Sequence, residues 1–236
     1  MSEYPYNMPQ YGGNDFSLSA RLSTVMRGVY TRMTFGLLVS AVVALLAYSQ
    51  GFLYFMATHS WLYWGLMIAE LAIVIILSAR LTKMQSSTAA AMFYLFAIVN
   101  GLTLSTIFAV YTAGSIAKTF FICAGVFGAM SIYGYTTKSD LSKMGSLLIM
   151  ALFGLIIASV VNIFWGNSTM DWIISFIGVA IFIGLTAWDT QQIKQMAQLM
   201  PASAAGHLAT LGALSLYLDF INMFLYLLRF FGSSRD

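Results

Sequence analysis

The chain has 236 residues, of which 60% are hydrophobic and only 8% are charged, and its formal net charge is +3. A water-soluble domain usually carries charge on about a quarter of its residues, so this composition excludes an ordinary soluble globule. The small net charge does not suggest nucleic-acid binding. The single cysteine, Cys123, excludes an internal disulfide and a zinc cluster.

Seven apolar stretches follow one another along the chain. Each is long enough for a membrane-crossing helix, which needs about 18 to 20 apolar residues. Because backbone polar groups in lipid must be satisfied within the segment itself, the stretches predict an all-α membrane protein with seven transmembrane helices. The expected spans are 31–50, 61–80, 88–111, 117–136, 144–165, 171–194 and 207–231.

The predicted organisation is one membrane domain with two short ends. Residues 1–22 are expected to be a flexible cytoplasmic tail, residues 23–232 the seven-helix domain, and residues 233–236 a short external tail. Cytoplasmic connections carry an excess of Lys and Arg. Eight of the eleven lie on the side of the N-terminus: Arg21, Arg27, Arg32, Arg80, Lys83, Lys138, Lys143 and Lys194. This bias predicts a cytoplasmic N-terminus and an external C-terminus.

The second and third spans carry polar residues at membrane depth. Glu70 lies midway along the second span and Asn100 lies within the third. Such groups are costly in lipid and usually functional, so both are candidate pore-lining residues, although an interhelical hydrogen bond also explains Asn100. Arg80 ends the second span. It is a candidate to compensate a charge on Asp189, or else an ordinary positive-inside residue that snorkels.

Glycines recur in the fourth and sixth spans, at Gly125, Gly128, Gly178 and Gly184. Small residues let two helices approach closely. We therefore expect these glycines to lie at helix–helix contacts rather than in a ligand site.

The last two spans each carry one aspartate. Asp189 and Asp219 both lie fifteen residues from position 204, so an antiparallel hairpin would bring their carboxyl groups to a similar depth. At about 1.5 Å per residue, Asp219 lies roughly 18 Å inward of Phe231 and Asp189 roughly 25 Å inward of Trp172. Two close carboxyl groups in apolar surroundings do not readily both ionise, so they are predicted to share a proton. Loss of that proton would leave like charges that separate or attract a cation.

Further polar residues share one face of the last span. Steps of three and four residues from Asp219 reach Ser215, Asn222 and Tyr226, while the opposite face is apolar. A polar stripe at membrane depth is predicted to face protein or a water-filled cavity. These three residues are therefore candidate latch or pore-lining residues.

Three segments carry a resemblance to a known family. They are SLYLDFINMFLYLLRFFG at 215–232, FGAMSIYGYTTKSDLSKMG at 127–145 and GLTAWDTQQIK at 184–194. Together they resemble the Bax inhibitor family, the transmembrane Bax-inhibitor-motif proteins, in its bacterial inner-membrane branch. The resemblance runs in order over about residues 25–232. Family members usually have Tyr where this chain has Trp188.

The resemblance implies a fold in which the last helix is central within a bundle of the other six. It also implies a pH-dependent calcium leak, gated by a proton-sharing latch of Asp189 and Asp219 and completed by a basic residue near Arg80. Calcium, which takes about six to eight oxygen ligands, would then be held only transiently at the two aspartates. The residues by themselves indicate a proton or a cation.

We therefore expect a pH-sensitive cation leak channel in a bacterial inner membrane, with no enzyme activity and no cofactor. Its expected partners are the lipid bilayer, protons and calcium or another cation, and the bundle is compatible with a monomer. The alternative is a membrane interaction protein that modulates a membrane-bound quality-control protease without transport. An intramembrane aspartyl protease is disfavoured, because the Gly-x-Gly that characteristically precedes one catalytic Asp is missing from both TAWD and LYLD.

Overall fold

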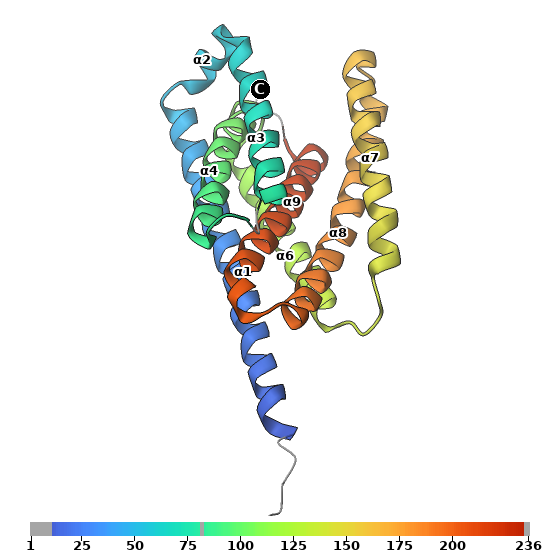
Figure 1. The fold of residues 1–236 in the computed structure, drawn as a ribbon. Coiled ribbons are helices and arrows are strands. Elements are labelled where there is room, and N and C mark those ends of the chain that lie inside the picture. The colour runs from blue at the N-terminus through green and yellow to red at the C-terminus, as the bar shows by residue number, and fades with distance from the viewer. Residues whose placement is uncertain (1–10, 81–82, 234–236) are drawn as a thin grey trace, which may run out of the picture.

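The computed structural model describes residues 11–80 and 83–233, and these ranges contain no β-strand. The helices are α1 (Tyr11–Ser49), α2 (Phe52–Thr58), α3 (Ser60–Arg80), α4 (Ser86–Leu104), α5 (Ile107–Val110), α6 (Ala113–Thr136), α7 (Ser142–Trp165), α8 (Ser168–Leu199) and α9 (Ala205–Phe231), with a 3-10 turn at Ala202–Ala204 (Figure 1). Seven spans in the described chain are long and apolar enough to cross a membrane, with α4 and α5 forming one of them. The prediction of an all-α protein with seven transmembrane helices is confirmed.

The first helix begins earlier than its apolar pattern suggests. Residues 11–22, expected in a tail, belong to α1, while residues 1–10 lie outside the described part of the chain. From Arg21 onward the helix has partners inside the bundle. Val25 and Val29 are buried, and the Arg21 guanidinium donates a 3.0 Å hydrogen bond to the Gln198 carbonyl oxygen at the end of α8. Of the expected external end at 233–236, only Ser233 is described.

Two further boundaries differ from the expected spans. The third span is interrupted at Ser105, where α4 ends and the short α5 follows. The Ser105 hydroxyl donates to the Leu102 carbonyl oxygen at 2.6 Å, and such back-bonding by serine bends helices. At the other end of the molecule, α8 runs five residues beyond the expected limit of 194, to Leu199.

The last helix forms the centre of the bundle. In the most apolar 18-residue stretch of α9, 67% of the residues are buried. The corresponding share is 6% in α3 and 11% in α7. α9 packs directly against α1, α4, α6 and α8, whereas α3 reaches the bundle mainly through α4, and α7 mainly through α8. Figure 1 shows α3 and α7 on opposite sides of α9. The central position expected for the last helix is therefore confirmed, with α3 and α7 as the outer pair.

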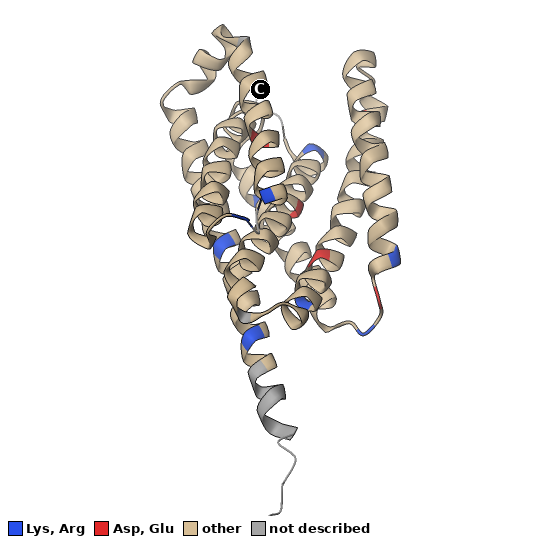
Figure 2. Cartoon of the chain, in the orientation of Figure 1, with Lys and Arg blue, Asp and Glu red and all other residues tan. Residues whose placement is uncertain are grey.

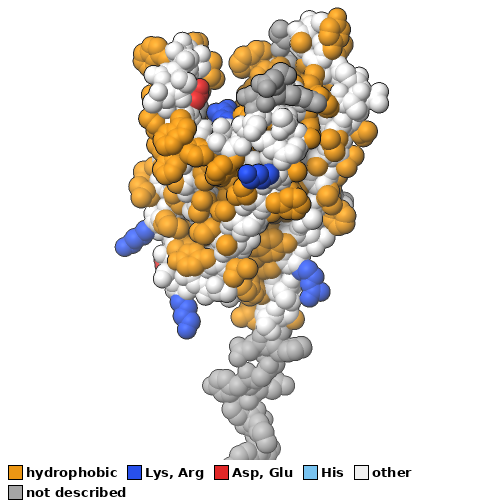
Figure 3. Space-filling view, turned by 180° about the vertical axis from the view of Figure 1, so that it is seen from behind, with side chains coloured by type: hydrophobic (Ala, Val, Ile, Leu, Met, Phe, Trp, Pro, Cys, Tyr) orange, Lys and Arg blue, Asp and Glu red, His pale blue; other side chains and the backbone are white. Residues whose placement is uncertain are grey.

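The outer surface is apolar over most of its height. Leu71, Ile75, Phe153 and Ile157 are among the large side chains exposed on α3 and α7. Figure 2 shows few charged positions on the ribbons, and Figure 3 shows hydrophobic side chains spread over the rear face with only a few basic side chains among them. Such a surface is suited to contact with lipid rather than water.

Glycines allow the closest helix contacts, but only some of these glycines are the ones that the sequence predicts. A Cβ atom added at Gly178 would lie 2.7 Å from the Tyr226 ring, and one added at Gly184 would lie 2.6 Å from Leu148. Gly125 and Gly128 instead face open space, so the packing role predicted for them is wrong. On α6 the close approach occurs nearer its C-terminal end, at Gly134, which lies against the backbone of Ala187 in α8.

The connection between α8 and α9 is held on two sides. The Arg32 guanidinium of α1 donates to the Gly206 carbonyl oxygen at 2.5 Å and to the Thr210 hydroxyl at 2.7 Å. On the other side, a His207 ring nitrogen lies 2.8 Å from the Met84 carbonyl oxygen, which precedes α4. These contacts anchor the start of α9 to α1 and to the segment that precedes α4.

The contact at Gly134 yields the first prediction. Gly134→Ala should destabilise the protein by about 1–3 kcal/mol, because the new methyl group meets the rigid backbone of α8 rather than a movable side chain. Gly125→Ala, on the same helix, is the matched control. The thermal unfolding midpoints of both variants in detergent would be compared, and equal midpoints would contradict the packing described.

Candidate functional site

A large cavity lies between α3, α4, α7, α8 and α9. Its volume is about 760 Å³. Most of its wall is apolar, and its polar wall residues are Glu70, Asn100, Thr103, Trp188, Asp189, Gln192, Ser215, Asp219, Asn222 and Tyr226. The cavity therefore gathers the candidate residues of four of the seven spans.

The two aspartates both line this cavity and lie close enough to interact electrostatically. Asp189 of α8 accepts a hydrogen bond from the Ser215 hydroxyl of α9, and it interacts electrostatically with Asp219. Asp219 is only 4% exposed, and its Oδ2 atom has no hydrogen-bond partner in the part of the chain that the structure describes. A carboxylate oxygen left alone in apolar surroundings is costly, so a proton or a cation is its natural partner. The hairpin thus brings the acids together as the spacing predicts.

A third carboxyl group lies on the opposite wall. Glu70 of α3 accepts hydrogen bonds from the Thr103 hydroxyl at 2.6 Å and from the Asn100 amide nitrogen at 3.3 Å. The Asn100 oxygen in turn accepts a 2.8 Å hydrogen bond from the Tyr217 hydroxyl, which lies 2.6 Å from the Ser40 hydroxyl. This buried chain of polar groups joins α3, α4, α9 and α1.

Sequence reasoning identified Glu70 and Asn100 but missed Tyr217 and Ser40. Tyr217 lies on the side of α9 whose sequence pattern is apolar. In the structure its ring packs edge-on against Phe93 and Phe96 in the core. The available signal was the hydroxyl itself, since a buried tyrosine usually finds a hydrogen-bond partner.

The remaining candidates take different places. Ser215, Asn222 and Tyr226 line the cavity, but the Asn222 amide donates to the Leu218 carbonyl oxygen of its own helix at 2.8 Å. Tyr226 stacks on Phe182, with ring centroids 6.1 Å apart. Arg80 lies exposed at the end of α3. It does not line the cavity, and the described residues include no hydrogen bond or ion pair between it and either aspartate. The structure therefore does not bring Arg80 into the aspartate pair.

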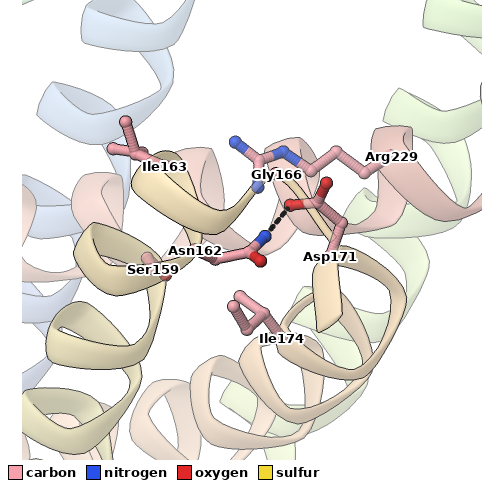
Figure 4. Close-up of a pocket in the computed structure, with 7 residues that line it drawn as sticks. All are labelled: Ser159, Asn162, Ile163, Gly166, Asp171, Ile174 and Arg229. Carbon is pink, nitrogen blue, oxygen red and sulfur yellow. Dashed lines mark hydrogen bonds between the residues drawn. The ribbon is translucent and has the colours of Figure 1, made fainter. Parts of the chain in front are cut away.

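A second, smaller polar pocket lies where α7 and α9 end and α8 begins. Figure 4 shows the Asn162 amide donating to the Asp171 carboxylate at 2.7 Å, with the Arg229 side chain beside them. The pocket has a volume of about 290 Å³. The Arg229 guanidinium also lies 5.8 Å from the centre of the Tyr226 ring, which lines the large cavity.

The donor set available for a metal is limited. Nowhere in ranges 11–80 and 83–233 do three or more His, Cys, Asp or Glu residues form a group that could hold a metal ion. Calcium at the aspartates would therefore need backbone, amide or water oxygens in addition to the carboxylates. Such a loose site is suited to transient passage rather than to storage.

Comparison with known proteins gives one consistent result. The family model described as "Inhibitor of apoptosis-promoting Bax1" matches residues 22–236. Inner membrane protein YbhL of Escherichia coli strain K12 is 49% identical over 220 residues, covering 92% of this chain and 94% of YbhL. An uncharacterized protein of Borreliella burgdorferi is 46% identical over 88% of this chain and 91% of its own length. Uncharacterized protein RP147 of Rickettsia prowazekii is 43% identical over 91% of this chain and 92% of its own length. The resemblance found in the three motifs is confirmed.

The buried network yields the second prediction. Tyr217→Phe keeps the aromatic packing but leaves the Asn100 oxygen without its donor, which should cost about 1–2 kcal/mol. Tyr54→Phe is the matched control, because the Tyr54 side chain is 78% exposed. Unfolding midpoints in detergent would be measured for both variants, and an unchanged midpoint for Tyr217→Phe would mean that the network adds no stability.

Proposed function

The chain belongs to the Bax inhibitor family, and we propose that it is a pH-sensitive leak channel for calcium or another small cation. The observation that carries this proposal is the Asp189–Asp219 pair, in which one buried carboxylate oxygen has no partner in the described structure. The pair lies on two helices that must move apart if a path is to open between them. A proton on the pair therefore acts on the position of the helices.

The proposed gate works through the number of protons on the pair. With one shared proton, a hydrogen bond ties α8 to α9 and the channel is closed. Without it both carboxyl groups are charged and repel each other; for scale, any two unit charges at about 4 Å repel by about 4 kcal/mol at an effective dielectric constant of about 20. This repulsion is relieved when the helices separate or when a cation enters between the carboxylates. Flux is therefore expected to rise with pH.

The wall of the cavity supports cation passage rather than catalysis. Glu70, Asp189 and Asp219 line it from three different helices, while no lysine or arginine is among its described lining residues. Carboxylate and amide oxygens around such a cavity can replace part of the hydration shell of a cation. We accordingly propose a channel that has no enzyme activity and needs no cofactor.

The proposed location is a bacterial inner membrane, by analogy with the Escherichia coli relative, which is named an inner membrane protein. The proposed orientation has the N-terminus in the cytoplasm. It is supported by the positions of Arg21, Arg32 and Lys194, which all bond to backbone carbonyl groups near one end of the bundle. Basic residues gathered at one end of a bundle favour the cytoplasmic side.

Flux measurements on reconstituted protein test the gate. Liposomes loaded with a calcium-sensitive dye would report calcium entry over a range of pH. A gate that opens on the loss of one proton changes its open population by up to about tenfold per pH unit. In Asp189→Asn and Asp219→Asn the shared proton is replaced by a permanent amide donor, so flux should become nearly independent of pH.

Asp140→Asn is the control variant, because Asp140 is an exposed residue in the connection between α6 and α7. Its flux should follow the unmodified protein. A normal pH curve in both cavity variants would remove the pair from the mechanism. Absence of flux in the unmodified protein at every pH would instead favour the role of a membrane interaction protein.

A further inference from the structure

The large cavity is reached from the lipid-facing side of the bundle. Residues of both outer helices line it, among them Leu71 of α3 and Ile156 of α7. These two side chains are also 63% and 49% exposed on the outer surface. Since α3 packs mainly on α4 and α7 mainly on α8, no extensive contact between α3 and α7 closes the space between them (Figure 1). The wall between cavity and bilayer is therefore incomplete at this point.

The size and lining of the cavity exceed what a small ion uses. Its volume of about 760 Å³ falls within the range of about 300–1,000 Å³ found for pockets that bind organic ligands. Most of the wall is aliphatic or aromatic, so a bare or hydrated metal ion would leave this apolar surface in contact with water. An occupant with an apolar body would cover it, at a gain of about 25 cal/mol for each Å² removed from water.

The acidic side chains of the cavity determine which polar group of that occupant would be favourable. The carboxyl groups of Glu70, Asp189 and Asp219 converge on it from three helices, and the buried Asp219 Oδ2 atom lacks a hydrogen-bond partner in the described chain. A fatty acid would place a fourth carboxylate beside these groups, which is unfavourable. A neutral acyl chain would fill the apolar part but leave the Asp219 oxygen unpartnered. An ammonium group would both neutralise charge and donate hydrogen bonds.

The aromatic side chains of the wall point to the same chemistry. Trp188 and Tyr226 line the cavity and are partly exposed, while Phe96 and Phe182 line it from the buried core. Aromatic faces attract organic cations, with a gain of about 0.5–2 kcal/mol per well-placed ring. A cavity that combines carboxyl groups, aromatic rings and an apolar wall is matched by a cation that carries its own apolar body.

We propose that the cavity binds a lipophilic amine, which enters from the bilayer between α3 and α7 and places its ammonium group between Asp189 and Asp219. The apolar body of the amine then lies against Leu71, Val74 and Ile156. This site goes beyond the proposed leak, because binding of the amine requires the cavity and its carboxyl groups but no passage of ions.

Fluorescence titration with a pair of probes tests the site. The protein in phosphatidylcholine nanodiscs would be titrated with dodecylamine that carries a dansyl group at its far end, and with the N-acetyl derivative of the same probe, which is neutral. Empty nanodiscs give the background of simple partitioning. Saturable binding of the amine is expected, at least tenfold tighter than that of the acetylated probe.

Two variants and a control assign the binding to the cavity. Asp219→Asn should weaken binding of the amine at least tenfold and leave the acetylated probe unaffected. Asp171→Asn, which removes an acid from the smaller pocket near the start of α8, should bind like the unmodified protein. If Asp219→Asn does not fold, Ile156→Trp carries the test, because it narrows the opening at an exposed position and should weaken binding of the amine.

Equal binding of the amine and the acetylated probe would overturn the proposal, since the cavity would then be an apolar slot for lipid chains. Unchanged binding in folded Asp219→Asn and in Ile156→Trp would also overturn it. The result is separable from the proposed channel. Binding of the amine without ion flux would contradict only the proposed channel. Flux gated by pH without binding of the amine would contradict only the proposed amine site.

Discussion

The structure depends on the burial of an aspartate pair between its two most tightly packed helices. Asp219 is a buried residue in the middle part of α9, and Asp189 of α8 interacts with it. Small residues make this approach possible, since Gly178 of α8 leaves room for the Tyr226 ring and Gly212 of α9 leaves room for Ile193. Charge on the pair therefore opposes the same packing that holds the pair together. Changing the number of bound protons changes the stability of that helix contact.

The bundle is closely packed on one side of α9 and more open on the other. On the side of α1, α4 and α6, the Tyr217 hydroxyl joins Ser40 and Asn100, and the Cys123 thiol lies 3.6 Å from the Phe220 carbonyl oxygen. On the side of the cavity, α3 and α7 each rely mainly on a single neighbour. A movement that separates the carboxyl groups must part α8 from α9, which share the most extensive helix contact of the described bundle.

The parts that the sequence predicts are those that depend on local periodicity. Seven apolar stretches define the spans, and equal distances from one turn place Asp189 and Asp219 at similar depth, because helix rise is constant. The parts that it does not predict depend on tertiary partners. The contact of Arg21 near the start of α1 relies on the end of α8, and the position of Tyr217 relies on rings and polar groups from two distant helices. The position of Arg80 in the sequence likewise does not predict the direction in which its long side chain extends.

The large cavity and the smaller pocket beside Asp171 differ in charge, and α9 contributes residues to both. The large cavity has three carboxyl groups, whereas the smaller pocket pairs Asp171 with Asn162 and adds the guanidinium of Arg229. Tyr226 lines the first, and its ring lies 5.8 Å from the guanidinium of Arg229, which lines the second. Because Tyr226 is also held by Phe182 and Gly178, it stays in place only while α8 and α9 remain in contact. The contact between α8 and α9 that brings the aspartates together thus also holds Tyr226 between the large cavity and the smaller pocket.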